Sequence, residues 1–165
     1  MLTDFRLESA SERTIAALEA DVGHVEISPT ILNLLNRIWP VLREQGVRTD
    51  HNIVLYRAGE NRPLRITVGV EILSPLEERD GVRTFTTPAG QSAAVTHFGP
   101  YSDLGRAYEE LVRWSGAGGH REAGVSWEIY GDWDEDPARL RTDVYLLLAD
   151  ERPADDPHSR GGQAR

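Results

Sequence analysis

The residues with the clearest chemical potential are one glutamate and two tyrosines in segments that have strand-like patterns. Glu128 lies in the middle of residues 125–131, two positions before Tyr130, and Tyr56 lies near the end of residues 52–57. Successive side chains of a strand point to opposite faces, so Glu128 and Tyr130 share a face, and Tyr56 occupies the corresponding face of its own strand. A carboxylate among phenols suits a delocalised organic cation, because each tyrosine ring attracts a cation by roughly 0.5–2 kcal/mol and the carboxylate adds a charge-assisted contact. The alternative interpretation of Glu128 is a solvated residue on an exposed sheet face.

The elements that must position these side chains occur twice along the chain. Each copy contains a strand, an amphipathic helix and two further strands; the copies span about residues 13–73 and 88–149, with residues 82–85 as an additional strand between them. One copy alone would leave a sheet face exposed, so the two copies form the stable unit. The sequence therefore predicts an α+β domain of duplicated β-α-β-β units, with a pseudo-twofold antiparallel sheet, helices on one face and a ligand cleft between the halves.

Local signals set the expected limits of the two helices. In the first copy, Ser28 is a good N-cap with Pro29 at the first helical position, while Pro40 should kink the helix and Gly46 should end it. In the second copy, the helix is expected over residues 101–115, before a glycine-rich stop.

Side-chain alternation also predicts which sheet face lies under the helices. One set is purely apolar and is expected to pack under them: Ile53, Leu55, Trp127 and Ile129. The other set is expected on the opposite face, where the two halves would meet: Val54, Tyr56, Glu128 and Tyr130. Trp133 follows the last of these strands and could fold over the cleft as a lid.

The ends and the composition narrow the class of protein. Residues 1–12 are expected to be a short lead-in, residues 13–149 the domain, and residues 150–165 a disordered tail. There is no signal peptide, no apolar run long enough to cross a bilayer and no cysteine, which favours a cytoplasmic protein without disulfides or a membrane partner. The net charge is −9 and the 18 basic residues are scattered arginines, so direct DNA binding is not expected. Twelve residues before the domain are also too few for a helix-turn-helix.

Several motifs that could suggest other chemistry fail in detail. Residues 132–136 imitate the opening of an EF-hand loop, but the sixth position is Pro137 and the twelfth is Asp143 instead of a bidentate glutamate. The histidines lack metal-ligand spacing, and no G-x-S-x-G nucleophile motif occurs. We therefore expect no metal and no cofactor.

A succession of motifs in the second copy resembles a known family. The runs are Pro88–Ala89–Gly90, His97–Phe98–Gly99–Pro100–Tyr101, Leu104–Gly105–Arg106–Ala107–Tyr108 and Trp127–Glu128–Ile129–Tyr130. They resemble the GyrI-like small-molecule-binding domain, which is also the effector-binding half of AraC- and MerR-type multidrug regulators. The first copy matches more loosely, through Trp39, Gly46 and Tyr56.

The resemblance implies a ligand held between the two halves. It puts the cation-contacting glutamate at Glu128 and aromatic pocket walls at Tyr56 and Tyr130, with further walls at Trp39, Tyr108 and Tyr145. Some free-standing members resemble hydrolases of strained cyclopropane-containing toxins that use a glutamate and a tyrosine. For this chain, those catalytic residues would be Glu128 and Tyr56.

Three functions remain open at this level. The first is a free-standing protein that binds or sequesters small cationic or aromatic molecules of the multidrug type, as a monomer or homodimer. The second is a hydrolase of strained electrophiles, in which burial would tune Glu128 as a general base. The third is a gyrase-inhibitor-like protein-interaction module with an acidic surface.

Overall fold

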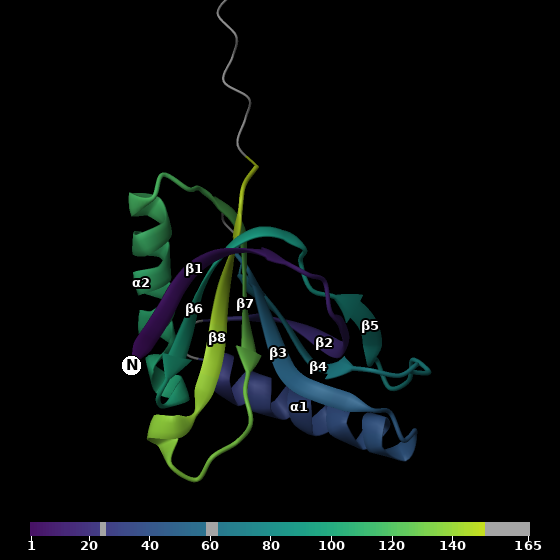
Figure 1. Ribbon diagram of the computed structural model, residues 1–165. Helices are drawn as coiled ribbons and strands as arrows, with labels where there is room; N and C mark the ends of the chain where they lie inside the picture. Colours follow the sequence, from purple (N-terminus) through teal and green to yellow (C-terminus); the bar gives the residue numbers. More distant parts are fainter. Residues whose placement is uncertain (24–25, 59–62, 151–165) are drawn as a thin grey trace, which may run out of the picture.

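Two β-α-β-β units build one antiparallel sheet, with one additional strand at each edge (Figure 1). Over the residues that the computed structural model describes, 1–23, 26–58 and 63–150, eight strands lie in the order β1-β6-β8-β7-β3-β4-β2-β5. The strands are β1 (Leu2–Ala10), β2 (Thr14–Val22), β3 (Thr49–Arg57), β4 (Leu64–Ile72), β5 (Arg83–Thr86), β6 (Gly90–Phe98), β7 (Glu122–Tyr130) and β8 (Arg141–Leu148). The two units meet where β3 pairs with β7 at the centre of the sheet. The α+β class and the duplicated architecture predicted from the sequence are confirmed.

Two helices cover one face of this sheet. Helix α1 (Ile27–Glu44) packs on residues such as Val54 and Val68, and α2 (Leu104–Ala117) packs on Val95 and Val144. The prediction that both helices lie on one face is therefore confirmed. Neither described helix is long and apolar enough to cross a membrane.

The C-terminus of α1 is closed by a glycine with positive φ. Gly46 has φ 63° and donates to the carbonyl of Arg43 at 3.1 Å, and Val47 donates to the carbonyl of Leu42 at 3.0 Å. These two bonds are those of a Schellman motif, which satisfies carbonyl groups that the helix leaves unpaired. Gly46 therefore ends the helix, as its sequence position predicted.

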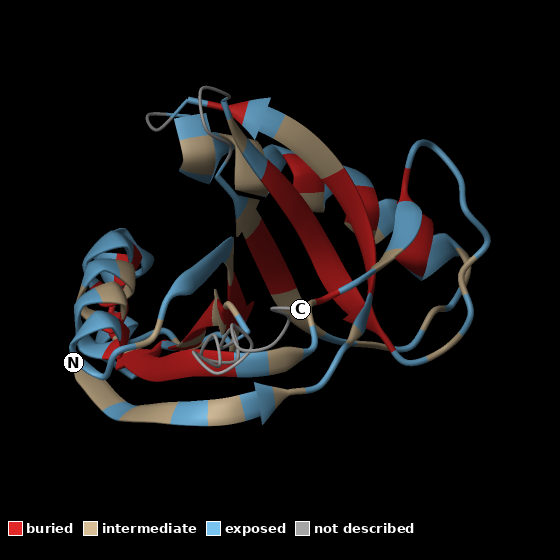
Figure 2. Ribbon diagram, turned by 90° about the horizontal axis from the view of Figure 1, so that it is seen from above, coloured by how far each residue is buried: buried red, intermediate tan, exposed pale blue. Residues whose placement is uncertain are grey.

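The prediction of which face the helices cover was wrong. The helices pack against the set that contains Val54 and Tyr56, whereas Ile53 and Trp127 lie on the helix-free face. These apolar side chains are nevertheless buried, because the sheet bends until strands from its two ends approach one another (Figure 2). Both faces are consequently apolar at the centre, and side-chain alternation alone could not tell them apart.

The segments outside the two copies also contribute to the sheet. Residues 2–10, expected as a lead-in, form the edge strand β1 against β6, and the additional strand appears as β5 beside β2. Helix α1 begins at Ile27, one residue before the predicted cap Ser28. Residues 151–165 of the tail predicted over residues 150–165 lie outside the described residues, as do residues 59–62.

Close packing at one glycine generates a stability prediction. A Cβ on Gly69 of β4 would lie 2.9 Å from side-chain atoms of Ala17 and Ile15 and 3.0 Å from the carbonyl oxygen of Ala16. We expect Gly69→Ala to lower the free energy of unfolding by about 1–3 kcal/mol, since a close-packed interior cannot yield without strain. Urea denaturation would measure the change.

A matched substitution provides the control. A Cβ on Gly105, in α2, would meet nothing within 4 Å. Alanine there should raise the free energy of unfolding by up to about 1 kcal/mol, because alanine is the better helix former. Equal effects of the two substitutions would contradict the packing explanation.

Candidate functional site

A buried carboxylate held by two tyrosines lies on the helix-covered face of the central strands. The side chain of Glu128 is on β7, and the residue is 7% exposed. The hydroxyl of Tyr56 on β3 donates to Glu128 Oε2 at 2.9 Å, and the hydroxyl of Tyr130 donates to the same oxygen. The remaining oxygen, Oε1, accepts no hydrogen bond from the described residues. The structure thus brings together three of the predicted site residues.

The pseudo-twofold arrangement explains why two tyrosines converge on one carboxylate. Tyr56 and Tyr130 are separated by the same number of residues as Val54 and Glu128, so each pair consists of equivalent positions in the two units. Val54 and Glu128 are also direct cross-strand partners, which puts them beside the pseudo-twofold axis. Each tyrosine lies two residues further along its own antiparallel strand, so the phenols approach Glu128 from both sides.

Burial dominates the electrostatics of this cluster. Removal from water raises the pKa of Glu128 above its ordinary value of 4.5, although the hydrogen bonds from Tyr130 and Tyr56 favour the charged form. Burial and then the nearby Glu128 charge raise the pKa values of Tyr56 and Tyr130 well above those of free phenols. Both tyrosines therefore remain neutral hydrogen-bond donors at any physiological pH.

Further aromatic side chains pack against Tyr130 or against the apolar clusters on which the two tyrosines pack. Tyr130 packs against the apolar clusters under both helices, so it lies at their junction. Tyr101 meets it edge-on with ring centroids 5.3 Å apart, and is 42% exposed. Trp39 of α1 packs on the same cluster as Tyr56, and Tyr108 of α2 packs on the cluster that includes Tyr130. Tyr101 was not among the predicted site residues, although its place directly after the Gly99–Pro100 turn could have indicated it.

The two remaining predicted residues lie on the opposite face of the sheet. Tyr145 stacks on Trp127 with centroids 5.0 Å apart and an interplanar angle of 4°. Tyr145 and the 74% exposed Trp133 line a separate pocket of about 610 Å³. They therefore do not share a pocket wall with Glu128: alternation along β8 turns Tyr145 to the other side, and Trp133, in the segment after β7, lines the same pocket as Tyr145.

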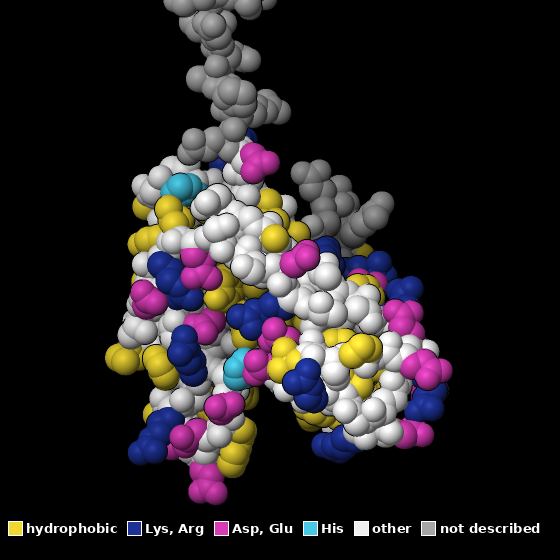
Figure 3. Space-filling model, turned by 45° about the vertical axis from the view of Figure 1, so that its right-hand side comes forward, with side chains coloured by type: hydrophobic (Ala, Val, Ile, Leu, Met, Phe, Trp, Pro, Cys, Tyr) yellow, Lys and Arg dark blue, Asp and Glu magenta, His cyan; other side chains and the backbone are white. Residues whose placement is uncertain are grey.

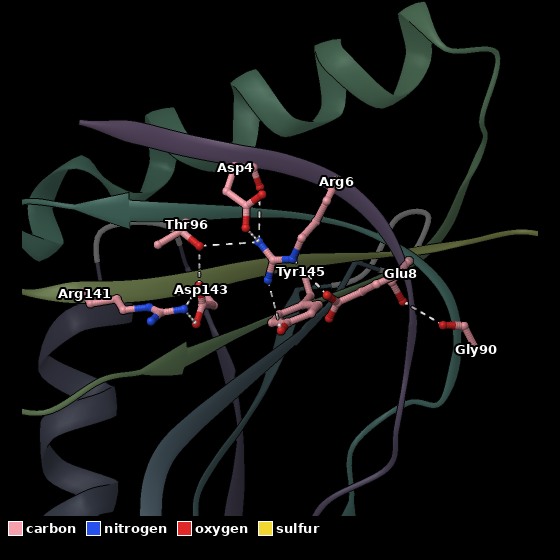
Figure 4. A network of polar contacts seen from close by, with 9 residues as sticks. Asp4, Arg6, Glu8, Gly90, Thr96, Arg141, Asp143 and Tyr145 are labelled. Atoms are coloured by element: carbon pink, nitrogen blue, oxygen red, sulfur yellow. Dashed lines mark hydrogen bonds and ion pairs between the residues drawn. The ribbon is translucent and has the colours of Figure 1, made fainter.

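A polar network borders this second pocket (Figure 4). Arg6 of β1 donates to Glu8 at 2.8 Å and lies over the Tyr145 ring at 5.8 Å. Thr96 donates to Asp143 at 2.6 Å, and Arg141 pairs with the same carboxylate at 3.1 Å. Arg6 also donates to the hydroxyls of Thr96 on β6 and Tyr145 on β8, both at 3.4 Å, so the network links β1 to these two strands. On the face seen in Figure 3, acidic and basic side chains are likewise intermingled.

Comparison with known families identifies the class to which this fold and site belong. The family model of the GyrI-like small molecule binding domain matches residues 3–149, and the chain belongs to this family. The matched range includes residues 3–10 of β1, which the sequence analysis predicts as a lead-in before the domain. No curated protein matches the chain.

Solved structures share the fold at low sequence identity. A cryo-EM structure of an EcmrR–DNA complex has a TM-score of 0.74 and 18% identity over 88% of this chain, which spans 57% of the length of the EcmrR chain. A structure of SAV2435 bound to tetraphenylphosphonium has a TM-score of 0.64 and 9% identity, covering 89% of this chain and 94% of that one. A hydrolase from Listeria innocua has a TM-score of 0.57 and 11% identity, covering 88% and 91%.

The buried carboxylate generates a pH-dependence prediction. Since the folded pKa of Glu128 is raised, the folded protein binds more protons than the unfolded chain just above pH 4.5. The stabilisation by this group is fully present below the unfolded pKa and is lost as pH rises through the folded pKa. We therefore expect the free energy of unfolding of the natural protein to fall, relative to Glu128→Gln, as pH rises from about 4 to 7.

Urea denaturation of both proteins across that pH range would measure the difference. The exposed Glu109 on α2 offers a control, since Glu109→Gln removes the same charge without a buried partner. A difference that grows in favour of the natural protein with rising pH would mean that the tyrosine hydrogen bonds outweigh burial.

Proposed function

We propose that this GyrI-like domain binds small organic cations with aromatic character, held at Glu128 between Tyr56 and Tyr130. The observation that carries the proposal is the buried carboxylate whose two tyrosine partners both donate to one oxygen. A cation beside Glu128 would restore the electrostatic stabilisation that burial removes, and the faces of the phenols would add cation–π attraction. Its binding would also favour the ionised carboxylate and so release protons where Glu128 is protonated.

Access to this site requires a local rearrangement. Tyr130 is covered edge-on by Tyr101, which belongs to a short 3-10 turn (Tyr101–Asp103) ahead of α2. Tyr101 is 42% exposed, so its displacement costs less than the movement of a buried core residue. We infer that the ligand enters between the helices as Tyr101 turns away, in a minor state that ligand binding then populates.

The comparisons support this chemistry only by analogy. SAV2435 was solved with tetraphenylphosphonium, an organic cation rich in aromatic rings, and has the same fold. At 9% identity the likeness extends to the fold alone, so the argument for a cation here depends on Glu128 and its tyrosines.

Titration with a cationic planar dye and a neutral dye of the same shape tests the proposal. We expect saturable quenching of intrinsic fluorescence by the cation, and at least tenfold weaker binding in Glu128→Gln. A tenfold loss corresponds to about 1.4 kcal/mol, the scale of one charge-assisted contact. The neutral dye should bind weakly to both proteins.

Two controls assign the binding to this face. Glu109→Gln should leave the affinity unchanged, because it alters the net charge equally at an exposed position. Trp133→Ala should also have no effect, because Trp133 lines the pocket on the opposite face. Binding that depends on Trp133 and not on Glu128 would transfer the site to the other pocket and refute the proposal.

Hydrolysis of strained electrophiles is a second candidate, favoured by the 2.9 Å bond between Tyr56 and Glu128. Glu128 would take a proton from water as the resulting hydroxide adds to a ring carbon. The electron pair of the breaking carbon–carbon bond would take the Tyr56 proton, and Glu128 would then reprotonate Tyr56. The raised pKa of Glu128 brings a carboxylate closer to the range of an effective general base.

This candidate predicts turnover that binding alone does not. Tyr56→Phe should abolish product formation from a cyclopropane-containing substrate while the substrate still binds, as followed by mass spectrometry. Recovery of the substrate unchanged after prolonged incubation with the natural protein would exclude hydrolysis.

A further inference from the structure

Three buried polar atoms on the helix-covered face lack a hydrogen-bond partner within the described residues. They are Oδ1 of Asn52, Oγ1 of Thr142 and Nδ1 of His97. Thr142 is 0% exposed and His97 is 3% exposed, so bulk water does not reach them. Buried polar groups without partners are uncommon and destabilise the folded protein, so the occurrence of three on one face requires an explanation.

The three atoms belong to one row across four strands. Thr142 of β8 is the direct cross-strand partner of both Tyr130 and His97. Asn52 lies one position before Ile53, and Tyr130 one position after its partner Ile129, so Asn52 continues the row on β3. Paired residues in an antiparallel sheet point to the same face. We call these four residues, Asn52, Tyr130, Thr142 and His97, the polar row.

The polar row mainly offers hydrogen-bond acceptors. His97 Nε2 lies 3.2 Å from the carbonyl oxygen of Pro100, which can only accept, so Nε2 carries a proton, and in this tautomer of the imidazole Nδ1 presents a lone pair. Oδ1 of Asn52 accepts, and the hydroxyl of Thr142 can accept or donate. A group that carries O–H or N–H therefore matches the row, whereas an apolar group would leave all three atoms unpaired.

The polar row adjoins the Glu128 site directly. Tyr130 belongs to both, since it donates to Glu128 and is the cross-strand partner of Thr142. Glu128 is paired with Val144, so Thr142 is its diagonal neighbour, at a separation of about 7–8 Å. One small molecule can therefore reach both places.

We propose that the polar row is a hydrogen-bonding subsite that continues the Glu128 site across β7, β8 and β6. It takes a hydroxyl or N–H group of the same ligand whose cationic group lies at Glu128, and in this it rests on the proposed function. The ligand class is thereby narrowed to organic cations with a hydrogen-bond donor about 7–8 Å or less from the positive charge. Cations that carry no donor would occupy Glu128 alone.

The far end of the row, at His97, borders a surface pocket. His97 lines a pocket of about 300 Å³ together with Asp103, at the N-terminus of α2, and Arg106 and Glu110 of α2. A longer ligand can therefore extend beyond His97 toward charged side chains of both signs.

Two probes of equal charge and shape test the subsite. One is the 4-(hydroxymethyl)phenyltrimethylammonium ion and the other is the 4-ethylphenyltrimethylammonium ion, which differs only in having a methyl group where the first has its hydroxyl. By isothermal titration calorimetry, we expect the natural protein to bind the hydroxymethyl probe about tenfold more tightly, as one hydrogen bond to a buried partner would give. Thr142→Val should abolish this preference, and Thr142→Ser, which keeps the hydroxyl, should retain it.

The Thr142 and Glu128 variants distinguish an error in the proposed subsite from an error in the proposed binding at Glu128. Glu128→Gln should weaken both probes equally. Equal affinities in the natural protein, or a preference that persists in Thr142→Val, would overturn the subsite while Glu128-dependent binding stands. Absence of binding by both probes would overturn the proposed function together with the subsite.

A second measurement needs no ligand. If Oγ1 of Thr142 is unpaired in the free protein, Thr142→Val removes a buried polar group at nearly constant shape. The midpoint of thermal unfolding should then rise by about 2–4 °C. A fall in the midpoint would show that the hydroxyl already has a partner, and would contradict the proposal.

Discussion

Burial of one carboxylate beneath two helices is the constraint on which the candidate site depends. Glu128 occupies a position flanked by Val54 and Val144 in the neighbouring strands, where an apolar side chain would be more stable. Tyr56 and Tyr130 offset part of the cost through hydrogen bonds to one oxygen. Burial raises the pKa of Glu128 although these hydrogen bonds favour its charged form, so a cation beside the carboxylate would stabilise that form further.

The bend of the sheet gives the molecule a second buried apolar region, on the face opposite Glu128. Because strands from the two ends of the sheet approach one another, the helix-free face forms a second apolar cluster around Trp127 and Tyr145. Strand β7 contributes to both faces, with Glu128 and Tyr130 on one side and Trp127 and Ile129 on the other. Substitutions on the two faces therefore test separate sites, although the side chains are adjacent in sequence.

The departures from ordinary packing cluster in one region. The buried Glu128 lies on the same face of adjacent strands as Asn52, Thr142 and His97, whose buried polar atoms have no hydrogen-bond partner in the described part of the chain. Each lowers the stability of the free protein, and a ligand that pairs with them would return that stability on binding. Proteins commonly break packing and hydrogen-bonding rules where function requires it. The proximity of these groups therefore supports the proposal that Glu128 and the polar row are parts of one binding site.

The sequence by itself determined the features that depend on local periodicity. The order of strands and helices, the duplication and the common face of Glu128, Tyr56 and Tyr130 follow from helix and strand periods, which act over a few residues. The identity of the helix-covered face did not follow, because both central faces are apolar and only the long-range bend of the sheet distinguishes them. Residues 2–10 were also not predicted as a strand, since their burial lacks regular alternation and their pairing with β6 is interrupted by a bulge. Only the tertiary structure could separate Tyr145 and Trp133 from Glu128 and align the polar row, because strand register joins residues that are far apart in the chain.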